Sequence, residues 1–172
     1  MHVRDIMEQP VITCSSTSNS NHAAQLMWEH DFGSLPVVDP DGRLAGIVTD
    51  RDICMGAYTQ GITLAEIPVA SVMTKHALAC HLGDTVETAE ELMREAQIRR
   101  LPVINDEGCP VGVVTINDLA RLAARDQESA RDLDIVHTLA AIATPRAQSN
   151  GRAADTAAGL ETPAGWLIPG AS

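Results

Sequence analysis

The stretch Gly46-Ile47-Val48-Thr49-Asp50-Arg51-Asp52 returns 66 residues later as Gly112-Val113-Val114-Thr115-Ile116-Asn117-Asp118. Glycine, threonine and aspartate keep their spacing, and the flanking chain follows the same offset without a gap, so that Leu35-Pro36-Val37 aligns with Leu101-Pro102-Val103. Self-similarity at one fixed offset indicates two copies of a single supersecondary unit. The sequence therefore predicts a chain built from two related halves.

Hydrophobic periodicity changes in the same order within each copy. A short extended run comes first, Val11-Ile12-Thr13 in copy one and Ala77-Leu78-Ala79 in copy two, and a helical stripe follows it. Two further extended runs then form a hairpin pattern, and Thr49 or Thr115 opens a second helix. This order predicts an α+β fold in which β-α-β-β-α repeats form mixed sheets with helices packed on them.

The first helix of each copy has a start signal and an apolar stripe. In copy two, Asp84 followed three residues later by Glu87 is a capping pattern, and in copy one the stripe begins after Ser18. Both stripes have helical spacing: Ala23, Leu26, Met27 and His30 in copy one, and Ala89, Leu92, Met93 and Ala96 in copy two. Within them we expect Leu26-Met27 and Leu92-Met93 to face the core.

A single copy would be only marginally stable alone. A unit of about 60 residues buries about 60% of its unfolded surface, whereas a chain of twice that length buries about 68–70%. We therefore expect repeat one, residues 1–66, and repeat two, residues 67–125, to pack like faces together about a pseudo-twofold axis.

The chain beyond the repeats divides into a helix and a tail. Residues 126–143 carry apolar side chains at helical spacing before Pro145, which predicts a C-terminal helix. Residues 144–172 are rich in Ala, Gly, Thr, Pro and Ser, and we expect them to form a flexible, disordered tail. The apolar triplet Trp166-Leu167-Ile168 near the end of that tail is available to dock elsewhere.

Charge and composition exclude several classes of partner. A formal net charge of −11 argues against nucleic acid and anionic membranes, because both require a basic surface. An aromatic content of 2% argues against base-stacking platforms. No apolar run approaches the ~20 residues of a membrane span, and the N-terminus lacks the layout of a signal peptide. We expect a cytoplasmic protein.

The cysteines and histidines do not predict a disulfide framework or a metal site. No Cys-x-x-Cys pair occurs among the four cysteines, which favours buried, reduced thiols: Cys14, Cys54, Cys80 and Cys109. His76, Cys80 and His81 lie close in sequence, but His76 and Cys80 on one strand would be about 13 Å apart. Zinc ligands lie ~2.0–2.3 Å from the ion, so these two residues cannot share one.

The doubled pattern resembles the CBS (cystathionine β-synthase) domain pair, also called the Bateman module. The resemblance covers about residues 1–125 and rests on Asp5-Ile6-Met7, Leu35-Pro36-Val37-Val38-Asp39, the two Gly-x-x-Thr-x-x-Asp stretches and Val72-Met73-Thr74. As a stand-alone pair with a short extension, the chain looks like the small hypoxic-response type of CBS protein. The resemblance implies tandem CBS repeats without a catalytic domain.

The resemblance also implies a ligand. CBS pairs bind adenosine-containing molecules (AMP, ADP, ATP, S-adenosylmethionine or NAD) in clefts between the repeats, with Asp52 and Asp118 holding ribose hydroxyls and Thr49 and Thr115 contacting ribose or phosphate. Independently of the family, a threonine at a strand-to-helix junction directs a hydroxyl and free helix amides toward a phosphate. A carboxylate one turn later can accept both hydroxyls of a ribose.

Further residues are expected around the same ligand. The resemblance implies that the backbone at Val11-Ile12 and at Ala77-Leu78 flanks the adenine. Arg99 and Arg100 precede the second Leu-Pro-Val, where copy one has Gly33-Ser34, so they can supply positive charge to phosphates at one site only. Two inequivalent sites are therefore expected, and Arg51 is a similar candidate for the first.

Simpler interpretations remain open. Thr-x-x-Asp at a helix start also serves as a cap, and both roles can coexist. Arg99 and Arg100 could instead be solvated or paired with Glu87, Glu90 or Glu95.

The hypothesis from sequence is a regulatory, non-catalytic homodimer that passes nucleotide occupancy to an unidentified effector protein. The alternative is a ligand-independent dimerisation scaffold. An enzyme is poorly supported, because no catalytic triad order or phosphate loop is present.

Overall fold

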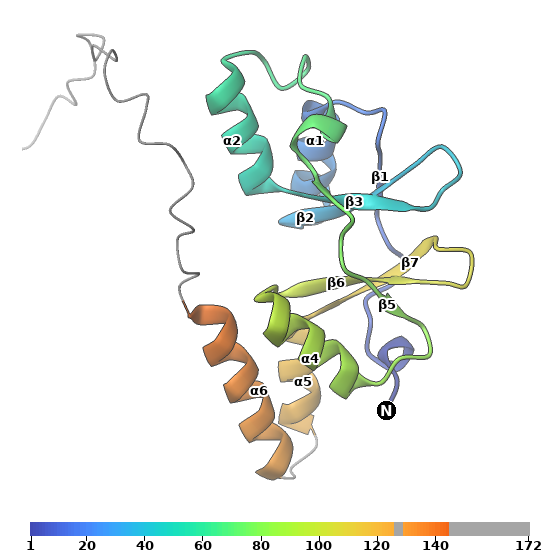
Figure 1. Cartoon of the computed structure of the whole chain (residues 1–172), viewed down its shortest axis with the longest axis vertical. Helices are drawn as coiled ribbons and strands as arrows, with labels where there is room; N and C mark the ends of the chain where they lie inside the picture. The colour runs from blue at the N-terminus through green and yellow to red at the C-terminus, as the bar shows by residue number, and fades with distance from the viewer. Residues whose placement is uncertain (126–128, 145–172) are drawn as a thin grey trace, which may run out of the picture.

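The computed structural model describes residues 1–125 and 129–144 and has the predicted α+β tandem architecture. Along the long axis lie, in order, the helices of the first half, its sheet, the sheet of the second half and the helices of that half (Figure 1). The two sheets therefore face each other, as the expected pairing of like faces requires. Residues 145–172, including the predicted tail, lie outside the described residues.

The elements of the two halves correspond one to one at the offset of 66 residues. The first half contains β1 (Cys14–Ser15), α1 (Ser20–His30), β2 (Ser34–Val38), β3 (Leu44–Thr49) and α2 (Asp50–Gln60). The second half contains β5 (Cys80–His81), α4 (Val86–Ala96), β6 (Arg100–Ile104), β7 (Pro110–Thr115) and α5 (Ile116–Arg125). The 3-10 turn η1 (Val3–Asp5) precedes the first half, α3 (Val69–Val72) and β4 (Thr74–Lys75) join the halves, and α6 (Ser129–Ala143) follows.

Several predicted boundaries were wrong by a few residues. The first strand of each half was expected at 11–13 and 77–79, but the strands begin later, at Cys14 and Cys80. Only two residues of each pair with the neighbouring strand, β2 or β6. Helix α1 is capped by Asn19 and not by Ser18, since Oδ1 of Asn19 accepts from the His22 N–H at 3.0 Å. Helix α4 is capped by Thr85 and not by Asp84, because the Asp84 carboxylate accepts from the His81 N–H.

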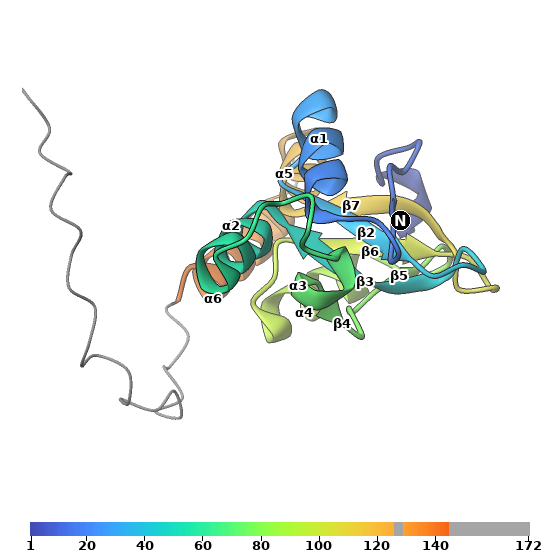
Figure 2. The same cartoon turned by 90° about the horizontal axis from the view of Figure 1, so that it is seen from above.

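Each sheet is completed by a segment that precedes the other repeat. Strand β4 lies beside β3 (Figure 2) and pairs with it, opposing Thr74 to Ile47, and at the same offset Glu8 forms an isolated bridge to Val113 of β7. The exchange extends into the cores, since Val3 is buried among second-half residues and Val69 among first-half residues. The halves are therefore interleaved by a reciprocal exchange.

The glycines of the doubled motif make room for the exchanged segments. A Cβ on Gly46 would lie 2.4 Å from the backbone oxygen of Thr74. A Cβ on Gly112 would lie 2.5 Å from Sδ of Met7 and 3.1 Å from the backbone oxygen of Glu8. Both glycines thus permit a close backbone approach, and the approaching group is the crossing segment.

We predict that Gly46→Ala destabilises the protein by about 1–3 kcal/mol, because backbone must move to admit the methyl group. Gly112→Ala should cost less, because its nearest obstacle is the flexible Met7 side chain. Gly83→Ala is the matched control, since no atom lies within 4 Å of its added Cβ. Urea unfolding of the three variants measures the order, and equal stability of Gly46→Ala and Gly83→Ala would contradict the exchange.

Two cysteines occupy equivalent core positions. Cys14 and Cys80 are free thiols, 1% and 0% exposed, at the start of β1 and β5. Burial raises the pKa of Cys80 to about 12, with Asp84 adding to the rise, and burial also raises the pKa of Cys14. These thiols therefore contribute to packing and carry little thiolate near neutral pH.

Alkylation of the native protein at pH 8 should leave Cys14 and Cys80 unmodified, because a raised pKa lowers the thiolate fraction and burial excludes the reagent. Both should react after unfolding in denaturant. Peptide mass spectrometry with Cys109 as the internal reference checks this. Modification of Cys80 at the rate of Cys109 in the folded protein would contradict its buried position.

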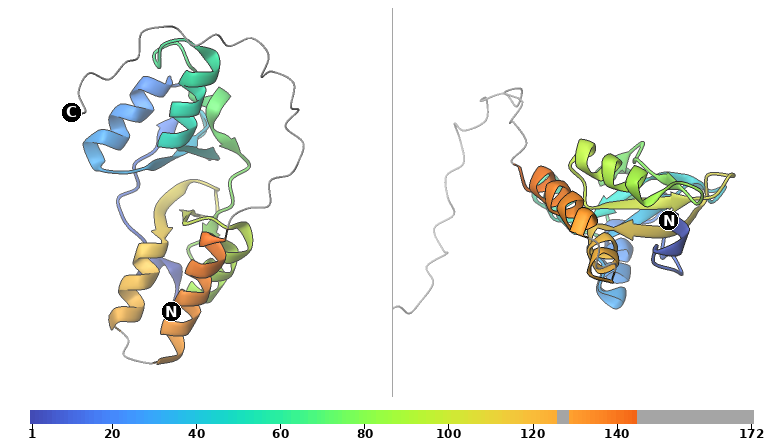
Figure 3. Two further views of the ribbon diagram at one scale, coloured as in Figure 1. Left: turned by 90° about the vertical axis from the view of Figure 1, so that its left-hand side faces the viewer. Right: turned by 90° about the horizontal axis from the view of Figure 1, so that it is seen from below.

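Helix α6 packs beside α4 and α5 (Figure 3), as the predicted C-terminal helix. Its Ile135 is buried in the second core and Ile142 packs against that core. The side chain of Gln97, at the end of α4, donates to the backbone oxygens of Ala141 and Thr144 at 3.1 and 3.3 Å. Within the described residues, no helix is long and apolar enough to cross a membrane.

Candidate functional site

The two halves meet at counterpart positions of β2 and β6. Nη1 of Arg100 donates to Oγ of Ser34 at 2.8 Å, and these residues are 66 positions apart. At the other end of the β2/β3 hairpin, the Leu44 N–H donates to the backbone oxygen of Gly108 at 2.9 Å. Because the counterpart of Leu44 is Pro110, which has no N–H, the reciprocal bond cannot form.

A cleft of ≈ 550 Å³, called cleft 1, lies where β3, the start of α2, the segment after β4 and the end of α4 meet. Its volume is within the range of small-molecule sites, about 300–1,000 Å³. Its lining combines apolar side chains with polar and basic ones. The lining residues used below are Ile47, Thr49, Asp50, Arg51, His76, Ala77, Leu78, Gln97, Ile98, Arg99 and Arg100.

The counterpart site, called cleft 2, is divided and more acidic. One hollow of ≈ 550 Å³ is bordered by Glu8, Asp31, Phe32, Arg99, Arg100, Thr115 and the α6 residues Leu139, Ile142 and Ala143. A smaller hollow of ≈ 50 Å³ contains Pro10, Val11, Ile12, Phe32, Arg100 and Thr115. Helix α6 forms part of the wall of cleft 2, and within residues 1–125 and 129–144 no counterpart of that helix borders cleft 1.

The structure brings most of the predicted site residues into the clefts. Cleft 1 is lined by Thr49, Ala77-Leu78, Arg99 and Arg100. Cleft 2 takes Val11-Ile12 and Thr115, and Arg99 and Arg100 border it as well. Asp52 and Asp118 are not among the lining residues of either cleft.

The two aspartates take part in helix caps, as the simpler interpretation expected. The Thr49 N–H and hydroxyl both donate to Oδ2 of Asp52, at 3.0 and 2.7 Å, and the Asp52 N–H donates back to Oγ1 of Thr49. Thr115 and Asp118 form the same three bonds. In α2, the Asp50 N–H donates to Gly33 and the Arg51 N–H to Oδ1 of Asp50. The amides that were expected to face a phosphate are therefore already bonded.

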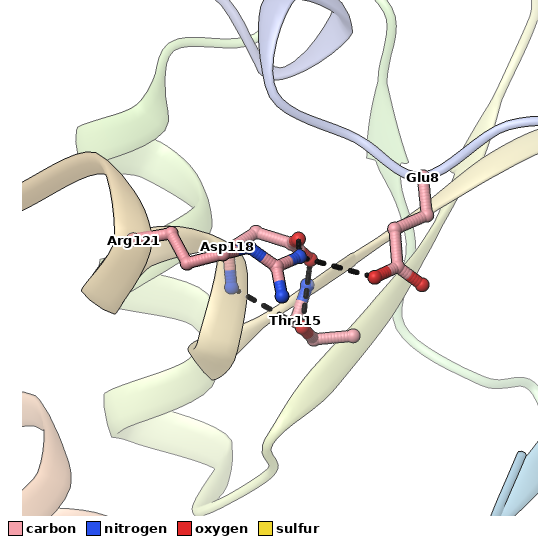
Figure 4. A network of polar contacts seen from close by, with 4 residues as sticks. All are labelled: Glu8, Thr115, Asp118 and Arg121. Carbon is pink, nitrogen blue, oxygen red and sulfur yellow. Dashed lines mark hydrogen bonds and ion pairs between the residues drawn. The ribbon is translucent and has the colours of Figure 1, made fainter.

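The second carboxylate oxygen distinguishes the two copies. Arg121 donates to Oδ1 of Asp118 and forms an ion pair with Glu8 at 3.1 Å (Figure 4). Asp118 is 4% exposed, so this contact compensates a buried charge. The counterpart of Arg121 is Met55, and among the described residues no contact engages Oδ1 of Asp52. Copy one thus keeps one carboxylate oxygen available.

Positive charge collects at cleft 1. Arg51, Arg99 and Arg100 line it, and none of them takes part in an ion pair with the described residues, in contrast to the alternative pairing with glutamates. The sequence interpretation missed Gln97, Ile98 and Phe32 as cleft residues. Their signal was present, because Ile98 and Phe32 are counterparts directly before Arg99 and Gly33.

A metal site does not arise from these side chains. Across residues 1–125 and 129–144, no three His, Cys, Asp or Glu side chains come close enough to hold one ion. His76 lines cleft 1 and is exposed, whereas Cys80 is buried in the core. The chemistry available in the cleft is therefore cationic and hydroxyl hydrogen bonding beside an apolar wall.

Comparison with known proteins places this geometry in a family. The CBS domain family matches residues 3–56 and 69–125. The CBS domain-containing protein YhcV of Bacillus subtilis is 39% identical over 118 residues, which cover 69% of this chain and 82% of YhcV. Hypoxic response protein 1 of Mycobacterium tuberculosis is 37% identical over the same shares of each chain. Relatives with enzyme names, a sulfurtransferase and homoserine O-acetyltransferases, are matched over about a quarter of their length.

Solved structures have the same fold. The CBS domain pair of MJ0100, crystallised with 5'-methylthioadenosine and S-adenosylmethionine, superposes with a TM-score of 0.66 at 31% identity. The match covers 74% of this chain and 98% of that one. The Pyrobaculum aerophilum protein PAE2072, complexed with AMP, has a TM-score of 0.66 at 25% identity, covering 79% and 98%. With its doubled motif, interleaved halves and two inter-repeat clefts, the chain belongs to the CBS domain family as a tandem CBS pair.

Proposed function

We propose that this protein is a non-catalytic regulatory module that binds one adenosine-containing ligand in cleft 1. The observation that carries the proposal is the meeting of three arginines, none in an ion pair with the described residues, a helix-capping threonine and apolar side chains in one cleft between the repeats. The ligands of MJ0100 and PAE2072 support the adenosyl class. Candidates are AMP, ADP, ATP, S-adenosylmethionine and NAD.

Each part of a nucleotide has a candidate partner in cleft 1. Because the first-turn amides of α2 are bonded, phosphate charge falls to Arg51, Arg99 and Arg100. The apolar side chains of Ala77, Leu78 and Ile98 line the cleft and suit the adenine ring. Asp52 lies one turn inside the helix that begins at the cleft, and its Oδ1 can accept from a ribose hydroxyl.

Cleft 2 is proposed to bind the ligand weakly or not at all. The Oδ1 of Asp118 is taken by Arg121, and Glu8 places a further carboxylate at the wall. An anionic ligand there would meet Glu8 and Asp31 beside the two shared arginines. One ligand per chain is the expected stoichiometry.

Ligand occupancy can reach α6 through Gln97. This residue lines cleft 1, and its side-chain amide holds the backbone oxygens of Ala141 and Thr144 at the end of α6. A ligand that displaces or orders Gln97 would change how α6 packs against the second half. Ligand binding would then shift the population between two positions of α6. An effector protein that contacts α6 would then sense the ligand.

Thermal unfolding with AMP, ADP, ATP, S-adenosylmethionine and NADH tests the proposal. Saturation at a hundred times Kd should stabilise the protein by about 2.7 kcal/mol. Asp52→Ala should reduce the ligand-induced shift, whereas Asp118→Ala should keep it while lowering the midpoint of the ligand-free protein, because the ion pair with Arg121 and a cap are lost. A shift lost only in Asp118→Ala would assign the ligand to cleft 2.

The arginines provide a more specific prediction. Arg51→Ala and Arg99→Ala should each weaken AMP binding about 10- to 100-fold, the effect of one charge-assisted hydrogen bond, and leave adenosine binding unchanged. Arg43→Ala is the matched control, because Arg43 is exposed and lines neither cleft. Calorimetric titration with AMP and adenosine measures both affinities. Equal loss for adenosine and AMP would mean that the arginines shape the cleft and do not hold phosphate.

The second candidate is a ligand-independent interaction scaffold, favoured by the caps that occupy both Thr-x-x-Asp motifs. In that case the function is homodimerisation or the binding of a partner protein to α6. Absence of any thermal shift, together with a dimeric mass by light scattering, would favour the scaffold over the sensor.

A further inference from the structure

His76 has an unusual backbone conformation beside cleft 1. Its φ of 54° lies in the left-handed region, and among the described residues Asp31 and Gln97 are the other non-glycine positions with a positive φ. Those two residues end helices α1 and α4, where a left-handed residue commonly terminates a helix. His76 follows strand β4 instead, so no helix end explains its conformation.

The fold itself gives no reason for a histidine at this position. A positive φ is uncommon for residues other than glycine. The His76 side chain is exposed, and no ion pair among the described residues engages it. Its imidazole lines cleft 1, and residues in sparsely populated backbone conformations concentrate at ligand sites. We therefore looked for a role of His76 in the cleft.

The counterpart of His76 in cleft 2 has no ionisable group. That counterpart is Pro10, whose ring fixes φ at about −65° and which lies at the smaller hollow of cleft 2. The left-handed backbone and the imidazole are therefore features of cleft 1 alone, like Arg51.

The charged groups near the imidazole come from three parts of the chain. They are Lys75 on β4, Asp50 and Arg51 at the start of α2, and Arg99 and Arg100 where β6 begins. Aspartate, lysine and arginine side chains ordinarily keep their charge between pH 5 and 8, whereas histidine changes its charge in this range. Protonation of His76 is therefore the step that changes the net charge of cleft 1 near neutral pH.

We propose that His76 is a further ligand-binding residue of cleft 1 and that its positive charge is coupled to the phosphate of the bound nucleotide. This inference rests on the proposed function of cleft 1. A bound phosphate favours the protonated imidazole, and by thermodynamic linkage the protonated imidazole favours phosphate binding by the same factor. Nucleotide binding then takes up a proton, and the module responds to pH as well as to its ligand.

Calorimetric titration of the full chain with AMP at pH 5.5 and pH 8 tests the proposal on the wild type and His76→Asn. Asparagine tolerates a left-handed backbone, so this variant removes the ionisable group and keeps the conformation. The ratio of Kd in His76→Asn to Kd in the wild type should be about fivefold larger at pH 5.5, where the imidazole is charged. Because both proteins bind the same AMP, the ratio cancels the titration of its phosphate.

His81→Asn is the matched control, because His81 is exposed on β5 and lines neither cleft. Its Kd ratio to the wild type should be the same at both pH values. Titration in two buffers of different ionisation enthalpy should show greater proton uptake per AMP in the wild type than in His76→Asn. A change in the shape of the cleft alone would leave that proton uptake unaltered.

Adenosine separates a contact with phosphate from a contact with the base. The Kd ratio for adenosine should not change with pH, because adenosine carries no phosphate. A ratio for AMP that is equal at both pH values, or one that changes equally for adenosine, would overturn the role of His76 and leave AMP binding in cleft 1 standing. Absence of AMP binding at both pH values would overturn the proposed function, and this inference with it.

Discussion

Thr74 and Glu8 each cross from one repeat to pair with a strand of the other, and this reciprocal exchange holds the remaining structure in place. The crossing segments pass over Gly46 and Gly112 at distances that no side chain could accommodate without movement. They continue directly into the residues that wall the clefts, Ala77-Leu78 on one side and Val11-Ile12 on the other. The packing that joins the halves therefore also forms the candidate binding sites.

The repeat offset allowed most of the fold to be predicted from sequence. Strand and helix order, the hairpins, the second-helix caps at Thr49 and Thr115 and the C-terminal helix follow from local periodicity and cap chemistry, which act over a few residues. The crossing segments could not be predicted, because each pairs with a strand of the other repeat. The contact of Arg121 with Glu8 joins residues 113 positions apart and was equally invisible. The exact helix caps, Asn19 and Thr85, depended on which of several adjacent polar residues faced the first turn.

Nearly symmetric backbones carry different charges at the two clefts. Copy one has Met55 where copy two has Arg121. Arg121 engages Oδ1 of Asp118, whereas Oδ1 of Asp52 stays available. Copy two has Arg99 and Arg100 where copy one has Gly33 and Ser34, and these two cations border both clefts. Arg51 adds a third cation to cleft 1 alone. Helix α6 adds a further difference, since it borders cleft 2 and contacts Gln97 of cleft 1. Duplication thus supplied the architecture, and a few substitutions made the sites unequal.

Cleft 1 is proposed to bind one adenosyl ligand, and cleft 2 to bind it weakly or not at all. Calorimetric titration of the full chain with AMP, repeated on Asp52→Ala and Asp118→Ala, tests it most directly. We expect one AMP per chain, strongly weakened binding in Asp52→Ala and nearly unchanged binding in Asp118→Ala. Two equal sites per chain, or binding lost only in Asp118→Ala, would contradict it.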